Sequence, residues 1–263
     1  MKTKKVVINK LSRGEIYGAM RLMKLGALLP LVRNQLENNL EYADLSFEDR
    51  IGTILYEARE QFLWRQLERV YRNGSHAKPV GAVKEEIIYS PERNLNCEVI
   101  KTLQSMDWVK GQRPYYVTIC GQSGTGKSYL TEVLIREALE QNVNLCYYDF
   151  SKFMRLTEGL SSEEEFDRLA DRLNRKDLII IEDIGLFRCT EGVIKMLFRL
   201  LDKRLGSGAL LFTSQYQVED WYEYFAGELG DNGIADAMME RLKNNSQSIE
   251  LKGPSLRVNR VAI

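Results

Sequence analysis

The stretch Gly121-Gln122-Ser123-Gly124-Thr125-Gly126-Lys127-Ser128 decides the fold of this chain, because it fits the phosphate-loop pattern GxxxxGK[ST] at every position. An apolar run precedes it and a helical pattern follows it. This order predicts a turn whose backbone N–H groups surround phosphate oxygens at the positive end of a helix. We expect the stretch and Tyr129 to bind ATP, with Lys127 reaching the β- and γ-phosphates and Ser128 holding Mg²⁺.

A second apolar run ends in two carboxylates. Residues 178–181 are four consecutive aliphatic side chains, and Glu182 and Asp183 follow them directly. Such a run is typical of a central strand of a parallel sheet, and ligands of these sheets bind beyond the carboxyl ends of the strands. Because adjacent strand residues face opposite ways, we expect different roles. Glu182 is expected to hold Mg²⁺ through water, and Asp183 to orient and polarise the attacking water.

A third apolar run, residues 210–212, ends in polar side chains. We expect Gln215 to sense the γ-phosphate, with Thr213 and Ser214 as alternatives for that role. A different interpretation is that Ser214 only caps a helix that starts near Val218.

Strand and helix patterns alternate from about residue 96 onward, which predicts an α/β fold with a parallel sheet of five strands between helices. The expected strands lie at 115–120, 143–148, 178–181, 209–213 and 248–251, and the expected helices at 127–140, 163–174, 193–205 and 234–243.

The chain before this region reads as helical. We expect a helical N-terminal domain over 1–76, a connecting strap over 77–95 and the ATPase domain over 96–263. Ser46 is a candidate N-cap, and Pro30 marks a kink or a helix start. One expected apolar helical stripe comprises Ile51, Ile54, Leu55, Ala58 and Phe62.

Composition excludes several classes of protein. Lys plus Arg and Asp plus Glu each number 37, which excludes a uniformly basic nucleic-acid coat protein but not a local basic patch. His76 is the single histidine, so no multi-histidine metal site is expected. The 4 cysteines form no CxxC pair, which is typical of reduced thiols in a cytoplasmic protein. The apolar stretch Leu25 to Val32 is too short to span a membrane, and none is expected as a partner.

Residues 1–95 hold 16 Lys and Arg against 12 Asp and Glu. A stripe at helical spacing can follow the phosphates of double-stranded DNA. The candidates are Arg59, Arg65, Arg69, Arg72 and Lys78. The alternative is a solvated face partly neutralised by Glu68. No base-reading motif is present, so we expect little sequence specificity.

Four segments together resemble one family. They are GQSGTGKSYL (121–130), DLIIIEDIG (177–185), LLFTSQYQVEDW (210–221) and ADAMMERLKNNSQSIELKGPSLR (235–257). The chain resembles the IstB transposition helper ATPases, AAA+ proteins related to the DnaC-type helicase loaders. Residues before 96 are similar to the helical leader of that family, most clearly at 19–22, 45–50 and 57–60.

The resemblance implies a protein that binds ATP, forms a homo-oligomer on double-stranded DNA, and recruits or stimulates an IstA-like transposase. It also implies that Arg241 acts as an arginine finger on a neighbouring subunit and that Arg257 is a nucleotide sensor. Two departures bear on the rate of hydrolysis. Glu182 occupies the first acidic position, where aspartate is usual, and Gln215 replaces the usual asparagine.

Three other functions compete with this one. A replicative helicase loader has the same fold, but the helical leader is more similar to the transposition branch. A small-molecule kinase needs an acceptor site and an arginine-rich lid, and it does not account for residues 235–257. A DNA scaffold that hydrolyses ATP slowly or not at all is motivated by Glu182 and Gln215.

Overall fold

The structure, a computed structural model, describes residues 10–229 and 232–257. The chain forms two compact units that divide between Arg65 and Gln66, inside one long helix. We call them the N-terminal unit and the C-terminal unit. The sequence placed this division at residue 76, after the helix rather than within it, and the bounds of the strap and the ATPase domain stay predictions. None of the described helices is long and apolar enough to cross a bilayer.

Helix starts in the N-terminal unit follow local signals. Ser12 and Glu15 form a capping box at the first helix. Pro30 lies in the first turn of the second helix, so the predicted helix start there is confirmed. The Asp49 N–H donates to the Ser46 hydroxyl at 3.1 Å, which confirms the predicted N-cap. The helices are α1 (Arg13–Leu22), α2 (Leu29–Glu37) and the first part of α3 (Phe47–Gly74).

The predicted apolar stripe of α3 is wrong for three of its five members. Ile54 and Ala58 are buried, but Ile51, Leu55 and Phe62 are exposed. At about 100° per residue the two buried residues lie at one edge of the predicted stripe, and the three exposed residues lie together on one side of them. Periodicity marks a possible contact face, but only the elements packed on it decide its width.

The C-terminal unit is built on a five-stranded parallel sheet. The strand order is β2-β3-β4-β1-β5, and each neighbouring pair is parallel. The prediction of a parallel sheet of five strands is therefore confirmed. The strands are β1 (Tyr116–Gly121), β2 (Leu145–Asp149), β3 (Leu178–Ile184), β4 (Ala209–Ser214) and β5 (Ser246–Leu251).

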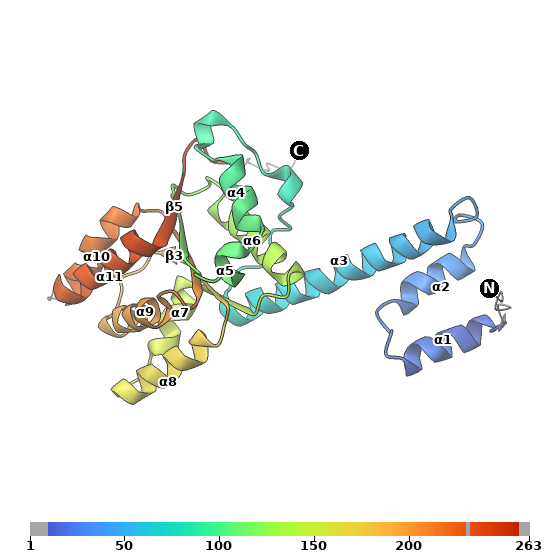
Figure 1. Ribbon diagram of the computed structural model, residues 1–263, viewed down its shortest axis with the longest axis horizontal. Helices are drawn as coiled ribbons and strands as arrows, with labels where there is room; N and C mark the ends of the chain where they lie inside the picture. The colour runs from blue at the N-terminus through green and yellow to red at the C-terminus, as the bar shows by residue number, and fades with distance from the viewer. Residues whose placement is uncertain (1–9, 230–231, 258–263) are drawn as a thin grey trace, which may run out of the picture. The chain divides into compact units, whose positions relative to one another are not determined.

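Helices cover both faces of this sheet (Figure 1). Ile179 and Ile181 point into the core on one face, and Leu178 and Ile180 into the core on the other. The first face carries α7 (Phe150–Thr157), α8 (Glu163–Asn174), α9 (Glu191–Arg204), α10 (Trp221–Leu229) and α11 (Asn232–Asn245). The second carries α4 (Cys97–Gln104), α5 (Asp107–Lys110), α6 (Lys127–Glu140) and the last turns of α3. The helices predicted at 127–140 and 163–174 are confirmed residue for residue.

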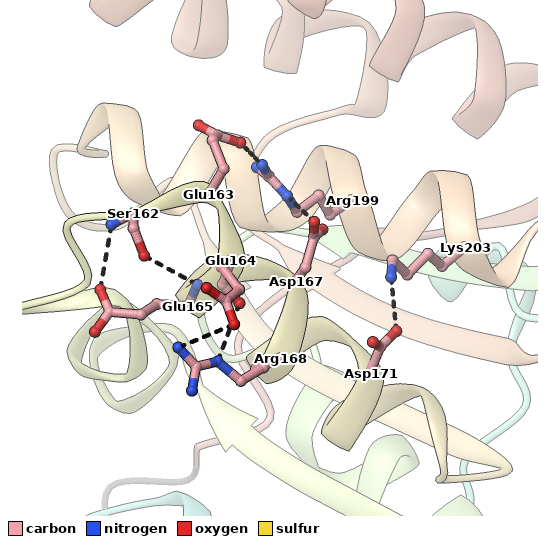
Figure 2. A network of polar contacts seen from close by, with 9 residues as sticks. All are labelled: Ser162, Glu163, Glu164, Glu165, Asp167, Arg168, Asp171, Arg199 and Lys203. Carbon is pink, nitrogen blue, oxygen red and sulfur yellow. Dashed lines mark hydrogen bonds and ion pairs between the residues drawn. The ribbon is translucent and has the colours of Figure 1, made fainter.

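A band of ion pairs joins α8 to α9 (Figure 2). Arg199 of α9 pairs with Glu163 and with Asp167, the latter at 3.2 Å. Lys203, one turn further, pairs with Asp171 at 2.6 Å. The acidic partners of these pairs are exposed, and pairs open to solvent contribute little each, so the buried faces of the two helices provide most of their attachment to the sheet.

The candidate nucleotide site

The phosphate loop connects β1 to α6 at the carboxyl edge of the sheet. Gly124 and Gly126 have φ of +85° and +96°, in the region that favours glycine. A Cβ on Gly124 would lie 2.1 Å from the Ser255 hydroxyl oxygen, and one on Gly126 would lie 2.8 Å from an Arg93 nitrogen. Both glycines are therefore required by the backbone turn and by the segments packed against it.

Lys127 is held inside the loop by backbone oxygens. Its Nζ donates to the carbonyl oxygens of Gly121 at 2.7 Å and Gln122 at 3.1 Å. Burial lowers the pKa of Lys127, while the charges of Asp183 and Glu182 act in the opposite direction. The ammonium group thus lies at the start of α6, close to both predicted carboxylates.

Glu182 lies near the end of β3, and its carboxylate is buried. The two oxygens of this carboxylate differ in their hydrogen bonds. Burial raises the pKa of Glu182 to about 7, and the hydroxyls of Tyr147, Thr131 and Ser128 lower it in part. The Tyr147 hydroxyl donates to Oε2 at 2.6 Å. Among the described residues, none forms a hydrogen bond of ordinary geometry with Oε1, although the Thr131 and Ser128 hydroxyls lie near the carboxylate.

These groups fit a magnesium ion. Mg²⁺ binds oxygen atoms and usually takes one or two protein ligands, with phosphates and waters completing its shell. The free Oε1 of Glu182 and the nearby hydroxyl of Ser128 are ligands of this type. The described residues contain no group of three or more His, Cys, Asp or Glu that could hold a metal by themselves. An ion here would therefore depend on the nucleotide for further ligands.

Asp183 lies at a kink in β3. Its φ is +60°, and the pairing of β3 with β4 shifts between Ile181 and Ile184. The Asp183 N–H donates to the Thr213 hydroxyl at 2.9 Å instead of continuing the ladder. The expectation that Glu182 and Asp183 face opposite ways assumed a regular strand, and the strand is irregular at this point, so their separate roles stay predictions. Both carboxylates act on Lys127.

Burial raises the pKa of Asp183, and the positive charges of Lys127 and Arg257 oppose that shift. The structure therefore brings Arg257, which is exposed, into the electrostatic surroundings of the predicted catalytic carboxylate. Its segment is attached to the phosphate loop, because the Leu256 N–H donates to the Gly124 carbonyl oxygen at 2.8 Å.

The polar residues after β4 divide into two groups. Thr213 supports Asp183, and the Ser214 hydroxyl donates to the Ile184 carbonyl at 2.7 Å. Ser214 does not cap the turn at Val218, whose N-cap is Gln217, so that alternative is wrong. Gln215 lines a cavity of about 410 Å³ together with residues of the phosphate loop. Its place is consistent with contact to a nucleotide, and its role as a sensor stays a prediction.

Arg93 and Tyr147 were missed by the sequence analysis. The Arg93 guanidinium, 7% exposed, donates to the carbonyl oxygens of Thr125 and Ile88, both at 2.7 Å. Neither residue belongs to a motif, and each reaches the site from an element far away in the sequence. No local signal could have identified them.

Arg241 is engaged within its own chain. Its guanidinium donates to Asp202 at 2.7 Å and to the Ala237 carbonyl at 2.9 Å, and it stacks over Phe198. These partners lie on α9 and α11, so the structure does not bring Arg241 to the phosphate loop of the same chain.

The five basic candidates are all exposed. Arg59, Arg65, Arg69 and Arg72 lie on α3, and Lys78 follows it. Arg69, Arg72 and Lys78 belong to the C-terminal unit and the other two to the N-terminal unit.

The family profile of IstB-like ATP binding proteins matches residues 19–262, nearly the whole chain. The chain belongs to the IstB-like ATP binding protein family. A relative from Sinorhizobium fredii, named as an insertion sequence ATP-binding protein, is 29% identical over 227 residues, which are 86% of this chain and 89% of that one. A relative from Mycobacterium tuberculosis, named as an ATP-binding protein in an insertion sequence, is 21% identical over 247 residues, 91% of this chain and 92% of that one.

Solved structures show the same fold for this IstB-like chain. The crystal structure of DnaI has a TM-score of 0.50 at 18% identity and covers 67% of this chain and 91% of that one. AMPPCP-bound DnaA from Aquifex aeolicus has a TM-score of 0.50 at 15% identity, over 66% of this chain and 50% of that one. At these identities the likeness shows the fold alone. The predicted AAA+ fold is therefore confirmed.

Proposed function

We propose that this IstB-like protein is an ATPase that assembles on double-stranded DNA and recruits or stimulates the transposase of an insertion sequence. The observation that carries the ATPase part is the position of Lys127. Its ammonium group is held at the start of α6, where the charges of Glu182 and Asp183 act on it. The transposition part is supported by the names of two relatives, which are described as ATP-binding proteins of insertion sequences.

The residues divide the chemistry between them. N–H groups of the phosphate loop and Lys127 bind the β- and γ-phosphates, and release of Lys127 from the Gly121 carbonyl accompanies binding. When bound, Mg²⁺ supplies charge neutralisation between the phosphates, held by Ser128 and Glu182. Asp183 orients and polarises the attacking water, while Gln215 and Arg257 contact the γ-phosphate.

Assembly would complete the site. An arginine finger stabilises the charge that develops during phosphoryl transfer, and here Arg241 would supply it to a neighbouring subunit. The exposed arginines of α3 would bind DNA phosphates at the same time. In this proposal ATP gates assembly, and the assembled chains present DNA to the transposase.

One experiment tests the proposal at three points. Phosphate release is measured with and without duplex DNA, while light scattering follows particle size in the presence of ATP. We expect turnover to rise with DNA and particles to grow only when both ligands are present. Lys127→Ala should remove ATP binding in calorimetry, and Lys203→Ala on α9, which loses an ion pair with Asp171, is the control. Unchanged ATP affinity in Lys127→Ala, or particles that ignore nucleotide and DNA, would refute the proposal.

A further inference from the structure

Beneath the phosphate-loop helix lies a buried polar chain of two tyrosines and two glutamates. It begins at Glu182, whose Oε2 accepts the Tyr147 hydroxyl at 2.6 Å. Tyr147, on β2, is 3% exposed and stacks on Tyr71 of α3, with ring centroids 4.6 Å apart. The Tyr71 hydroxyl donates to Oε2 of Glu132 at 3.2 Å. One continuous set of contacts thus runs from the proposed metal carboxylate to the last turn of α3.

Glu132 anchors the other end of this chain. It lies on α6, one turn after Ser128, and its side chain is 0% exposed. Its two oxygens accept three backbone N–H groups of the strap at 2.7 to 2.8 Å, from Val80, Gly81 and Ala82. With Tyr71 this makes four donors to one buried carboxylate, which is what a charge that forms no ion pair with another described residue needs.

The far end of α3 is pressed against the strand that carries Tyr147. A Cβ on Gly74 would lie 1.4 Å from the Tyr147 carbonyl oxygen, so only glycine permits this approach. The backbone at Tyr147 cannot shift without moving the helix end, and the Tyr147 ring is packed against Tyr71 of the same helix. Tight packing of this kind fixes the hydroxyl in one place.

A purely structural role is the simpler account of a buried tyrosine, and Tyr116 illustrates it. Its hydroxyl donates to the backbone oxygen of Leu201 at 2.8 Å, away from the phosphate loop. Tyr147 differs because its partner is the carboxylate beside Ser128, and because the other oxygen of that carboxylate has no partner among the described residues.

We infer that Tyr147 is a positioning residue for metal binding, which holds Oε2 of Glu182 so that Oε1 is turned toward the cation, and that Tyr71 braces it from α3. The inference rests on the proposed function, since the cation is the one bound with ATP. Glutamate has one more methylene than the usual aspartate and more rotamers. A fixed hydrogen bond to one oxygen removes that freedom, as partners of metal ligands generally do.

The test measures cation affinity rather than turnover. Mn²⁺ is titrated into the full-length protein saturated with a non-hydrolysable ATP analogue, and free Mn²⁺ is counted by electron paramagnetic resonance. We expect Tyr147→Phe to weaken Mn²⁺ binding about tenfold, the low end for partners of a metal ligand. Analogue affinity measured in EDTA should not change. Tyr116→Phe is the matched control and should match the wild type in both.

Two further variants keep the test decisive. In a Glu182→Gln background, Tyr147→Phe should cause no additional loss of Mn²⁺ affinity. Tyr71→Phe keeps the ring contact and loses only the bond to Glu132, so we expect a smaller loss in the same direction. It serves as the test if Tyr147→Phe does not fold. Wild-type Mn²⁺ affinity in Tyr147→Phe, or an equal loss in Tyr116→Phe, would overturn the inference alone. A wild-type protein that binds no analogue would overturn the proposed function as well.

Discussion

Glu182 and Asp183 are the two residues at which this chain departs most from local rules. One is a carboxylate buried to 4% exposure, and the other is an aspartate at φ of +60° within a strand. Each departure costs stability, of order 1–3 kcal/mol for a strained backbone. Both lie beside Lys127. Departures of this kind concentrate at functional sites, where the surrounding fold enforces them.

The burial of Glu182 predicts a pH-dependent stability of the nucleotide-free protein. Its pKa is about 7 in the folded chain against an ordinary 4.5. Between these values the folded chain retains a proton that the unfolded chain has lost, so stability falls as the pH rises and the loss is complete above about pH 7. Glu182→Gln has no charge to bury and should gain about 3 kcal/mol over the wild type at pH 8.

Urea unfolding in EDTA at pH 5 and pH 8 checks this expectation. The difference between Glu182→Gln and the wild type should be small at pH 5, where Glu182 in the folded protein is protonated. A difference of the same size at both pH values would show that the variant acts through packing instead of charge.

At the scale of elements, helix ends are where local sequence acts most directly. The start of α8 is a capping box, in which the Glu165 N–H donates to the Ser162 hydroxyl at 3.3 Å and Glu165 accepts the Ser162 N–H at 3.2 Å (Figure 2). The helix predicted at 163–174 begins directly after this capping box. Short helices such as α5 offer too few residues for a periodic pattern, and they were missed.

Ser162→Ala should destabilise the protein by about 1 kcal/mol, because an N–H of the first turn loses its acceptor. Urea unfolding measures the effect. Ser161→Ala is the neighbouring control, since it removes only the exposed bond from the Ser161 hydroxyl to Glu165 at 3.2 Å, while the bond from its N–H at 2.8 Å survives. Equal losses in the two variants would mean that the cap itself contributes nothing.

At the scale of the whole molecule, the arginine finger that we propose for Arg241 would act on a second copy of the chain. Arg241→Ala should leave ATP binding by a single chain intact and reduce turnover in the assembly at least tenfold, as expected for an arginine finger. ATPase rates across protein concentrations measure this. Asp202→Asn removes the same ion pair but keeps the guanidinium, so it should retain turnover. An equal loss in both variants would attribute the effect to the ion pair within the chain.

The DNA binding that we propose also belongs to the scale of the assembled molecule. Removing two phosphate contacts lowers the slope of log affinity against log salt by about 2. We expect this of the double variant Arg69→Gln and Arg72→Gln, measured by fluorescence anisotropy on duplex DNA at several salt concentrations. Arg168→Gln on α8 is the control. It removes one positive charge, as each single change in the double variant does, but on a different helix. An unchanged slope would exclude these arginines as phosphate contacts.

Sequence alone determined the phosphate loop, the strand order in the chain and the acidic end of β3. Each of these features is encoded by consecutive residues, because the hydrogen bonds and the burial that produce it extend over only one strand or a few helical turns. The five apolar runs also required helices on both faces, since no other arrangement buries them.

The tertiary structure alone decided which distant groups meet. Arg93 contacts Thr125 across 32 residues, and Tyr147 contacts Glu182 across 35. The kink at Asp183 lies where β3 changes register against β4, and the Thr213 hydroxyl of β4 accepts its N–H, so it is described only together with the neighbouring strand. Such contacts follow from how parallel strands are connected and packed. The types of the two side chains do not by themselves specify such a contact, because many other pairings of the same residues would be chemically acceptable. The fold decides which pairing occurs.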